Sequence, residues 1–292
     1  MEFKGVYTAI ITPFNEDESI DYNALAKLIE FNIANGVAGI VPCGTTGESP
    51  TLDYEEHNEL IKFVIKQVAG RVSVIAGTGS NCTKEAIRMS QHAEKDEVDA
   101  LLLVNPYYNK PTQEGLYLHF KAIADSVSIP CVIYNIKGRT GVNVETPTLL
   151  RLINDCKNIT AVKEASGDLD QIKSVIDQAP KDFCVLSGDD NIALQVVKMG
   201  GKGIVSVASN VIPKQMNEMI SFALAGNFDE AEKLNKNMEK LFAIQFIETN
   251  PIPMKYILAK KGMCNEIYRL PMCALSSEHK VEVDKVINEM GL

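Results

Sequence analysis

Short apolar runs with strand character alternate with amphipathic helical patterns along most of the chain. The helical stretches repeat apolar residues at intervals of three and four, as Leu25, Leu28 and Ile29 do before Gly36. The predicted strands are residues 6–12, 39–43, 73–78, 100–105, 130–135, 159–165, 183–187 and 203–208. This alternation indicates the α/β class, and eight strand–helix units favour a closed (β/α)₈ barrel, the TIM barrel, over a doubly wound open sheet. No G-x-G-x-x-G pattern follows the first strand, which also argues against the open sheet.

The chain changes character near residue 227, after which only helical patterns occur. They include NFDEAEKLNKNMEKLFAIQFIE and SEHKVEVDKVINEMGL. We therefore expect a barrel over residues 1–226 and a C-terminal helical extension over residues 227–292. Because no low-complexity linker separates the two parts, we expect the extension to pack on the barrel and not to form an independent domain.

Net charge and hydropathy exclude several functional classes. The formal net charge of −9 argues against a nucleic-acid-binding surface, although a local cluster of donors can still bind a carboxylate. No apolar run approaches the roughly 20 residues that span a bilayer, so we expect no membrane partner. The N-terminal stretch MEFKGVYTAIITPF lacks the pattern of a signal peptide. The seven cysteines are odd in number and form no C-x-x-C pair, which fits a reducing cytoplasm.

The carboxyl ends of the predicted strands carry the candidate catalytic residues, because active sites of such barrels lie at that face. The candidates are Thr12, Gly44–Glu48, Asn105–Pro111, Tyr134, Lys163, Ser187–Asp190 and Ser206. Hydroxyl groups dominate this set. The four histidines all lie in helical stretches without metal-ligand spacing, so we expect neither a metal nor another cofactor.

Lys163 interrupts the apolar strand ITAVKEA and is the sharpest candidate. An ammonium in a buried strand is costly unless it is paired or deprotonated. The usual lysine pKa is about 10.4, and burial can lower such a pKa by roughly 3–5 units, which frees an amine that attacks a ketone to form an imine. On a strand Ala161, Lys163 and Ala165 share one face, and the flanking alanines leave room for the long side chain. The alternative is that Lys163 pairs with Glu164 or extends to the rim.

Four other motifs have both a functional and a structural interpretation. Tyr134 ends the strand CVIYN, where its phenol can relay protons or simply pack in the core. The turn GTTGE offers backbone N–H groups and two hydroxyls to a carboxylate, or caps the following helix. Asp189 or Asp190 in SGDD is interpreted as the N-cap of a helix that starts near Asn191. Arg139 is either a solvated loop cation or a carboxylate clamp.

Together these motifs resemble the pyruvate-dependent Schiff-base aldolase superfamily and, within it, the dihydrodipicolinate synthase family. The similarity spans nearly the whole chain, through GVYTAIITPF, GTTGESPTL, NPYYNKPTQEGLYLHF, YNIKGRTG, AVKEASGD, LSGDD, GIVSVASN and ETNPIPMKYIL. The resemblance implies a lyase that joins pyruvate to L-aspartate-4-semialdehyde in lysine and diaminopimelate biosynthesis. It also implies a homotetramer, built as a dimer of dimers, that uses no cofactor.

The resemblance implies a catalytic role for four residues of this chain. Lys163 would form the imine with pyruvate. Tyr134 and Thr45 would relay protons during imine formation and carbon–carbon bond formation. Tyr108, the second tyrosine of NPYYN, would reach into the site of the neighbouring subunit and complete the relay.

Four further residues match substrate-binding positions of the family. Thr46 would help to bind the pyruvate carboxylate, and Arg139 would hold the carboxylate of the aldehyde. Gly188 and Val205 would contribute backbone groups near the lysine. One departure affects this set: Lys137 stands where the family usually has a proline, and a glycine follows it, so we expect a more mobile loop around Arg139.

The resemblance also implies a feedback site for lysine. The matching residues are Ser49, His57, Asn81, Glu85 and Tyr107. However, Pro50 and Tyr54 stand where inhibited relatives often carry alanine and histidine, so a hydrogen-bonding imidazole is lost. We therefore expect weak or absent inhibition by lysine.

Other functions fit parts of the same pattern. N-acetylneuraminate lyases and keto-deoxy-sugar-acid aldolases belong to the same superfamily, but the second threonine of GTTGE and Arg139 favour the synthase. A non-catalytic barrel that binds a small carboxylate would use the same loops without turnover. A phosphate-binding isomerase barrel has only MGGKG in its favour, and a glycine-rich helix end explains that motif equally well.

Overall fold

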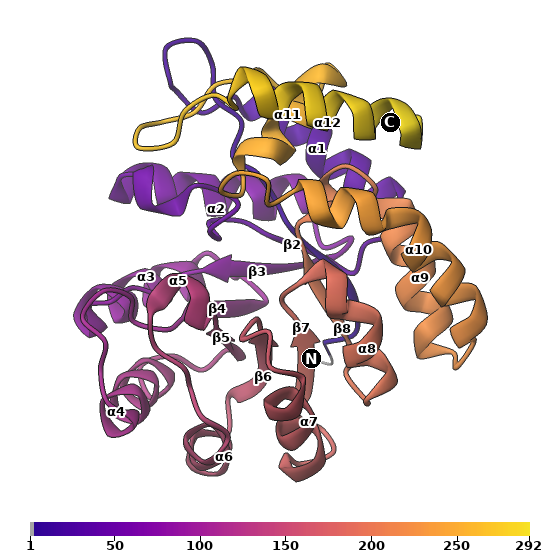
Figure 1. The fold of residues 1–292 in the computed structure, drawn as a ribbon. Helices are drawn as coiled ribbons and strands as arrows, with labels where there is room; N and C mark the ends of the chain where they lie inside the picture. The colour runs from indigo at the N-terminus through magenta and orange to yellow at the C-terminus, as the bar shows by residue number, and fades with distance from the viewer. Residues whose placement is uncertain (1–2) are drawn as a thin grey trace.

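Eight parallel strands close into a barrel in the computed structural model, which describes residues 3–292 (Figure 1). The strands are β1 (Gly5–Ala9), β2 (Gly39–Val41), β3 (Ser73–Gly77), β4 (Ala100–Val104), β5 (Cys131–Asn135), β6 (Ile159–Glu164), β7 (Cys184–Ser187) and β8 (Gly203–Ser206). Each strand pairs with the next one along the chain, and β8 closes the ring on β1. The predicted (β/α)₈ barrel is therefore confirmed.

The outer layer consists of helices that follow the strands. They are α1 (Tyr22–Ala34), α2 (Tyr54–Val68), α3 (Thr83–Lys95), α4 (Gln113–Ala124), the short α5 (Lys137–Thr140), α6 (Thr146–Asp155), α7 (Leu169–Gln178), α8 (Ala193–Lys198) and α9 (Pro213–Leu224). Single 3₁₀ turns lie at η1 (Ser49–Thr51), η2 (Asp190–Ile192) and η3 (Ala208–Asn210).

Polar side chains cap the N-termini of several helices. Asp53 accepts a hydrogen bond from the Glu56 amide at 2.8 Å, and the Glu56 carboxylate accepts one in return, which satisfies two amides at the start of α2.

The first strand ends earlier than the sequence predicts. The apolar pattern predicts a strand over residues 6–12, but β1 ends at Ala9. Beyond it, the Ile11 amide donates to the side chain of Asn210 at 3.1 Å instead of to a strand carbonyl. The Thr12 hydroxyl donates to the Gly47 carbonyl at 2.6 Å. These bonds turn the chain out of the sheet and tie it to the loop after β2.

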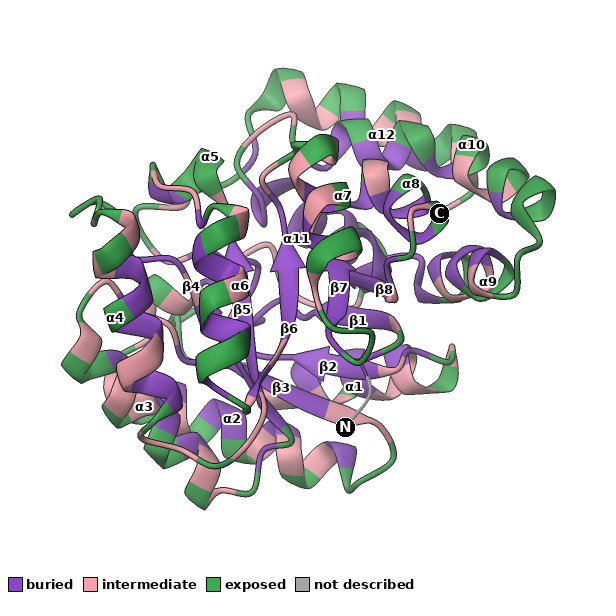
Figure 2. Cartoon of the chain, turned by 90° about the horizontal axis from the view of Figure 1, so that it is seen from below, coloured by how far each residue is buried: buried purple, intermediate pink, exposed green. Residues whose placement is uncertain are grey.

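Two apolar layers hold the barrel together, one inside the strand ring and one between strands and helices. The inner layer includes Tyr7, Ile75, Leu102, Val132, Ala161, Ala165, Leu186 and Val205. Because side chains alternate along a strand, the intervening residues point outward and pack beneath the helices. Figure 2 shows the consequence, since the strands are buried and exposure is confined to the outer helix faces and loops.

The C-terminal helices pack on the barrel and do not stand apart from it (Figure 1). They are α10 (Phe228–Ile244), α11 (Ile252–Lys260) and α12 (Ser277–Met290). Helix α10 lies against α8 and α9, and α11 lies against η3, next to the end of β8. The expected helical extension is thus present, and the exact boundary at residue 226 stays a prediction.

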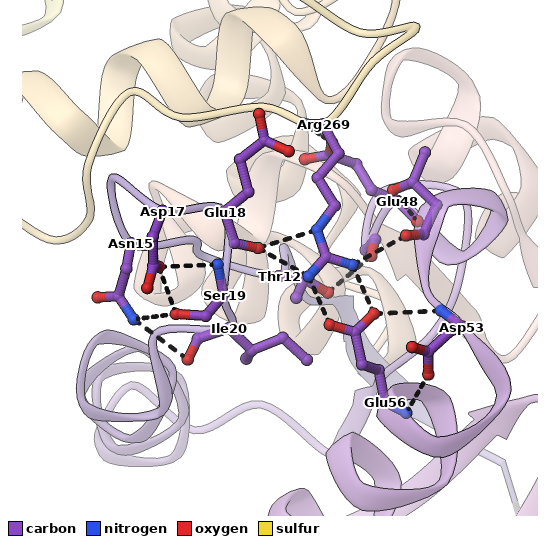
Figure 3. A network of polar contacts seen from close by, with 12 residues as sticks. Thr12, Asn15, Asp17, Glu18, Ser19, Ile20, Glu48, Asp53, Glu56 and Arg269 are labelled. Carbon is purple, nitrogen blue, oxygen red and sulfur yellow. Dashed lines mark hydrogen bonds and ion pairs between the residues drawn. The ribbon is translucent and has the colours of Figure 1, made fainter.

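Arg269 anchors the segment between α11 and α12 to the barrel loops (Figure 3). Its guanidinium forms a two-pronged ion pair with Glu56, with an Nη2–Oε1 distance of 2.5 Å, and this contact lowers the pKa of Glu56. The same side chain donates to the carbonyls of Glu18 and Thr51 at 2.7 and 2.9 Å. It also lies over the ring of Phe14. One side chain therefore joins the loops after β1 and β2 to the C-terminal segment.

Candidate active site

Lys163 and Tyr134 lie next to each other inside the barrel. They are register partners on β6 and β5, so their side chains point to the same face of the sheet. The Lys163 side chain is 5% exposed, and its Nζ lies 4.0 Å from the centre of the Tyr134 ring. Lys163 forms no salt bridge among the described residues, but the charge of Asp189 lies near enough for the two groups to interact. The amine therefore stands in the barrel interior against the Tyr134 ring, in a cavity that the Asp189 carboxylate also lines.

Glu164 does not pair with Lys163, because it points to the outer face of β6. Its carboxylate accepts hydrogen bonds from the Asn135 side chain at 3.1 Å and from the Ser166 amide at 2.9 Å. Gln171 on α7 donates to it as well. Burial raises the pKa of Glu164, and these donors oppose that rise. This hydrogen-bond network links the ends of β5 and β6 on the outer face of the barrel and so supports the positions of Tyr134 and Lys163.

Gly188 leaves the space through which the lysine side chain runs. A Cβ atom at this position would lie 2.6 Å from the Cβ of Ala165 and 3.2 Å from the Cε of Lys163. Both distances are too short for a side chain to be added without displacing one of the two residues. The glycine after β7 therefore provides room for the lysine, and the backbone contact implied by the resemblance stays a prediction.

A cavity of about 40 Å³ joins most of the predicted site residues. Its lining includes Thr45, Thr46, Tyr134, Arg139, Lys163 and Gly188. Val205 lies deeper, fully buried inside the barrel, and Val207 lines the cavity in its place. The predicted hydroxyls of Thr12 and Ser206 are occupied by internal hydrogen bonds with Gly47 and Asp190.

The interpretation of Asp189 or Asp190 as a helix cap is confirmed for the position of Asp189 but not for its side chain. Asp189 stands at the N-cap position of η2, but its side chain caps no amide. It lines the cavity instead, where burial raises its pKa and Lys163 and Arg139 oppose that rise. Asp190 is fully buried, and its carboxylate accepts bonds from the Ser206 hydroxyl at 2.5 Å and from two amides at the end of β8. It therefore joins the loops after β7 and β8.

The C-terminal extension contributes cavity residues that the sequence analysis did not assign. Phe246 and Asn250, from the segment between α10 and α11, line the cavity together with Lys163. Asn250 lies in the stretch ETNPIPMKYIL, which belongs to the resemblance but carries no recognisable catalytic pattern. Only its place in three dimensions identifies it as a site residue.

Tyr108 does not enter the cavity of its own chain. It lies on the loop after β4, has a positive φ of 72°, and its side chain is 89% exposed. An aromatic ring held out in this way is free to contact another molecule. The structure thus separates Tyr108 from the other three residues of the expected relay.

A second, larger cavity of about 380 Å³ lies beside the first and shares Thr45 and Arg139 with it. Four of the five residues implied for a lysine site line it, namely Ser49, His57, Glu85 and Tyr107, as do Pro50 and Tyr54. The fifth, Asn81, donates to the Tyr107 carbonyl at 3.2 Å and so stands next to it. His57 is tied to the Gly77 carbonyl at 2.8 Å, and burial lowers its pKa.

Neither a metal-binding cluster nor a membrane-spanning helix is found in the part of the chain that the structure describes. Within residues 3–292, no group of three histidine, cysteine, aspartate or glutamate side chains is arranged to hold a metal ion. No helix in the same range is long and apolar enough to cross a membrane.

A lysine amine inside a (β/α)₈ barrel, beside a tyrosine and two threonines, is the arrangement of an aldolase-type lyase that works through an imine. Comparison with known proteins narrows this class. The chain belongs to the dihydrodipicolinate synthetase family, whose model matches residues 2–290.

Its relatives and structural neighbours carry consistent names. The chain is 48% identical over 290 residues to the 4-hydroxy-tetrahydrodipicolinate synthase of Endomicrobium trichonymphae, and the match covers 99% of both chains. It is 53% identical over 274 residues to the enzyme of that name from Leptospira biflexa, covering 94% of this chain and 92% of the relative. The crystal structure of dihydrodipicolinate synthase from Aquifex aeolicus superimposes with a TM-score of 0.98 at 46% identity, covering 99% of each chain. These names favour the synthase over the sugar-acid aldolases.

Proposed function

We propose that the protein condenses pyruvate with L-aspartate-4-semialdehyde to give 4-hydroxy-tetrahydrodipicolinate, in the biosynthesis of lysine and diaminopimelate. The observation that carries this proposal is the buried Lys163 amine beside Tyr134, in a cavity that also holds Thr45, Thr46 and Arg139. The names of relatives that match almost the whole chain support the choice of substrates.

The first chemical step forms the imine. The Lys163 amine, after it gives up its ammonium proton, adds to the ketone carbon of pyruvate, and loss of water from the adduct leaves a C=N bond. The nitrogen gives up protons, and the leaving hydroxyl takes one. The Tyr134 ring packs against the amine and Thr45 lines the same cavity, which supports a role for both hydroxyls in moving these protons. Thr46 binds the pyruvate carboxylate.

The second step forms the carbon–carbon bond. A proton moves from the methyl carbon to the imine nitrogen, which gives an enamine. That carbon attacks the aldehyde carbon of the second substrate, and the aldehyde oxygen takes up a proton as the new bond forms. Arg139, at the cavity rim, holds the carboxylate of this substrate by charge-assisted hydrogen bonds. The amino group of the second substrate then attacks the C=N carbon, which closes the ring and releases Lys163. No cofactor enters these steps.

Reduction with borohydride tests the proposal directly. Incubation of the protein with pyruvate and borohydride should leave an adduct with the mass of a reduced pyruvate imine on the peptide that contains Lys163. A non-catalytic carboxylate-binding barrel would give no adduct. A parallel assay with aspartate semialdehyde and with sialic acid separates the synthase from N-acetylneuraminate lyase, and turnover of sialic acid alone would contradict the proposed substrates.

The exposed Tyr108 supports an assembly in which one chain completes the site of another. We expect a homotetramer built as a dimer of dimers, with the Tyr108 hydroxyl in the partner's relay. A Tyr108→Phe variant should lose turnover by roughly 10²-fold, because a proton path is broken, while pyruvate affinity changes little. Steady-state kinetics and pyruvate titration measure the two effects. Tyr107→Phe is the matched control and should keep its turnover, since Tyr107 lines the neighbouring cavity and not the one that holds Lys163. Equal losses of turnover and affinity would argue against the relay role.

The 380 Å³ cavity is the proposed position of a lysine site. Tyr54 contributes a phenol there, with a pKa raised by burial, where inhibited relatives often carry an imidazole. We therefore expect lysine at physiological concentration to leave most of the activity intact in a titration of the rate against lysine. Strong inhibition would contradict this expectation.

A cytoplasmic location completes the proposal. None of the seven cysteines forms a disulfide in the described part of the chain, which fits a reducing compartment. The substrates are small molecules, and neither nucleic acid nor a membrane is expected as a partner.

A further inference from the structure

Asn250 connects the C-terminal extension to the substrate cavity. It precedes α11, is only 3% exposed, and lines the same cavity as Lys163. Its side-chain amide Nδ2 donates a hydrogen bond of 2.9 Å to the hydroxyl oxygen of Thr46. Its other side-chain atom, Oδ1, has no hydrogen-bond partner among the described residues. The contact with Thr46 is therefore the one polar bond of this side chain.

We propose that Asn250 is a positioning residue that orients the Thr46 hydroxyl toward the pyruvate carboxylate. The inference rests on the proposed function, in which Thr46 binds that carboxylate. A hydroxyl carries one proton and two lone pairs. Because the amide of Asn250 donates to the oxygen, the hydroxyl proton points elsewhere and remains available for an acceptor in the cavity. Without this donor the hydroxyl rotates freely and donates to other acceptors.

The main chain of Asn250 makes a second contact with the site. Its carbonyl accepts a bond of 3.3 Å from Nη2 of Arg139, the residue proposed to hold the carboxylate of the second substrate. Asn250 thus adjoins both carboxylate-binding residues, but through different groups. Replacing its side chain removes the bond to Thr46 and keeps the carbonyl that faces Arg139. The two substrates should therefore respond differently to the substitution.

A second bond fixes the same loop to α11, the helix that follows Asn250. Glu48, two residues after Thr46, forms a buried ion pair of 2.6 Å with Lys255 on α11. The loop after β2 is thereby attached to the extension at two points. The Thr46–Asn250 bond joins residues 204 positions apart, and the ion pair joins residues 207 positions apart. The position of the Thr46 hydroxyl is therefore set by the extension as well as by its own loop.

The experiment compares Asn250→Ala, Thr46→Val and the double variant in the full-length enzyme. Asn250→Ala should raise the KM for pyruvate about tenfold, the usual effect of losing one hydrogen bond. The KM for aspartate semialdehyde should change by less than about threefold. In the Thr46→Val background, Asn250→Ala should raise the KM for pyruvate little further, because its effect passes through the Thr46 hydroxyl. Asn158→Ala is the matched control, since Asn158 donates two bonds to carbonyls away from the cavity.

Each outcome decides one question. If the wild-type protein gives no borohydride adduct with pyruvate, the proposed function fails, whatever the Asn250 variants do. If the adduct forms and Asn250→Ala keeps the wild-type KM for pyruvate, the positioning role is refuted. It is also refuted if the KM for pyruvate of the double variant rises by the product of the increases in the two single variants. Should Asn250→Ala not fold, the isosteric Asn250→Asp replaces it; this side chain can only accept, so it draws the Thr46 proton away, and an unchanged KM for pyruvate would again overturn the proposal.

Discussion

A Lys163→Ala variant should retain less than about one part in 10³ of the wild-type turnover. Without the amine no imine forms, and the remaining hydroxyls cannot convert the methyl group of pyruvate into a nucleophile. The variant should also give no adduct with pyruvate and borohydride. The fold should persist, because the lysine forms no salt bridge and the nearby Asp189 carboxylate keeps the charge of Arg139 beside it. Steady-state kinetics, mass spectrometry and circular dichroism measure the three effects.

The matched control for this prediction is Lys202→Ala. Lys202 directly precedes β8 and so lies at the opposite end of the barrel from the cavity. Its replacement should leave turnover close to the wild-type value. Normal product formation by Lys163→Ala would overturn the imine mechanism, and so would a trapped adduct on another lysine.

The second large effect concerns stability. Lys255→Ala should lower the free energy of unfolding by about 3–5 kcal/mol, because it leaves the Glu48 carboxylate buried without its partner. The Lys255 and Glu48 side chains are 0% and 1% exposed, and Lys255 also donates to the Ile267 carbonyl at 2.8 Å. Burial lowers the pKa of Lys255, and the nearby Glu48 charge opposes that shift, so the pair is held together against a large desolvation cost. Urea unfolding followed by circular dichroism measures the loss.

Two further variants test the cause of that loss. Replacing both partners, with Glu48→Gln and Lys255→Met, should lower the free energy of unfolding much less than Lys255→Ala does, since no unpaired charge remains in the interior. Lys233→Ala breaks the exposed pair with Glu230 and should cause no measurable change, because water screens that pair. If Lys255→Ala lowers the free energy of unfolding no more than Lys233→Ala does, the buried pair does not stabilise the fold.

The placement of Lys163 illustrates what local sequence predicts well. A strand has a period of two, so Ala161, Lys163 and Ala165 had to share a face. A parallel barrel pairs consecutive strands, so the ends of β5 and β6 had to be neighbours. A different local rule, the helix-cap preference of aspartate, predicted the position of the SGDD motif but not what its side chains do. An aspartate before a helix is usually a cap, but the buried donors of the β8 loop bind Asp190 and leave Asp189 facing the cavity.

The alternation of strands and helices, together with the residues at the strand ends, determined from sequence alone the barrel, the inward-facing lysine and its tyrosine neighbour. These features follow from periods of two and 3.6 residues and from the order of parallel strands, which are local properties of the chain. The tertiary structure alone decided that Asn250 lies against Thr46, that Lys255 neutralises Glu48, and that Tyr108 points away from its own cavity. The first two contacts join residues about two hundred positions apart, and the exposed Tyr108 side chain is free to contact another molecule. No periodic pattern encodes them, because they depend on how the finished barrel and its extension fit together.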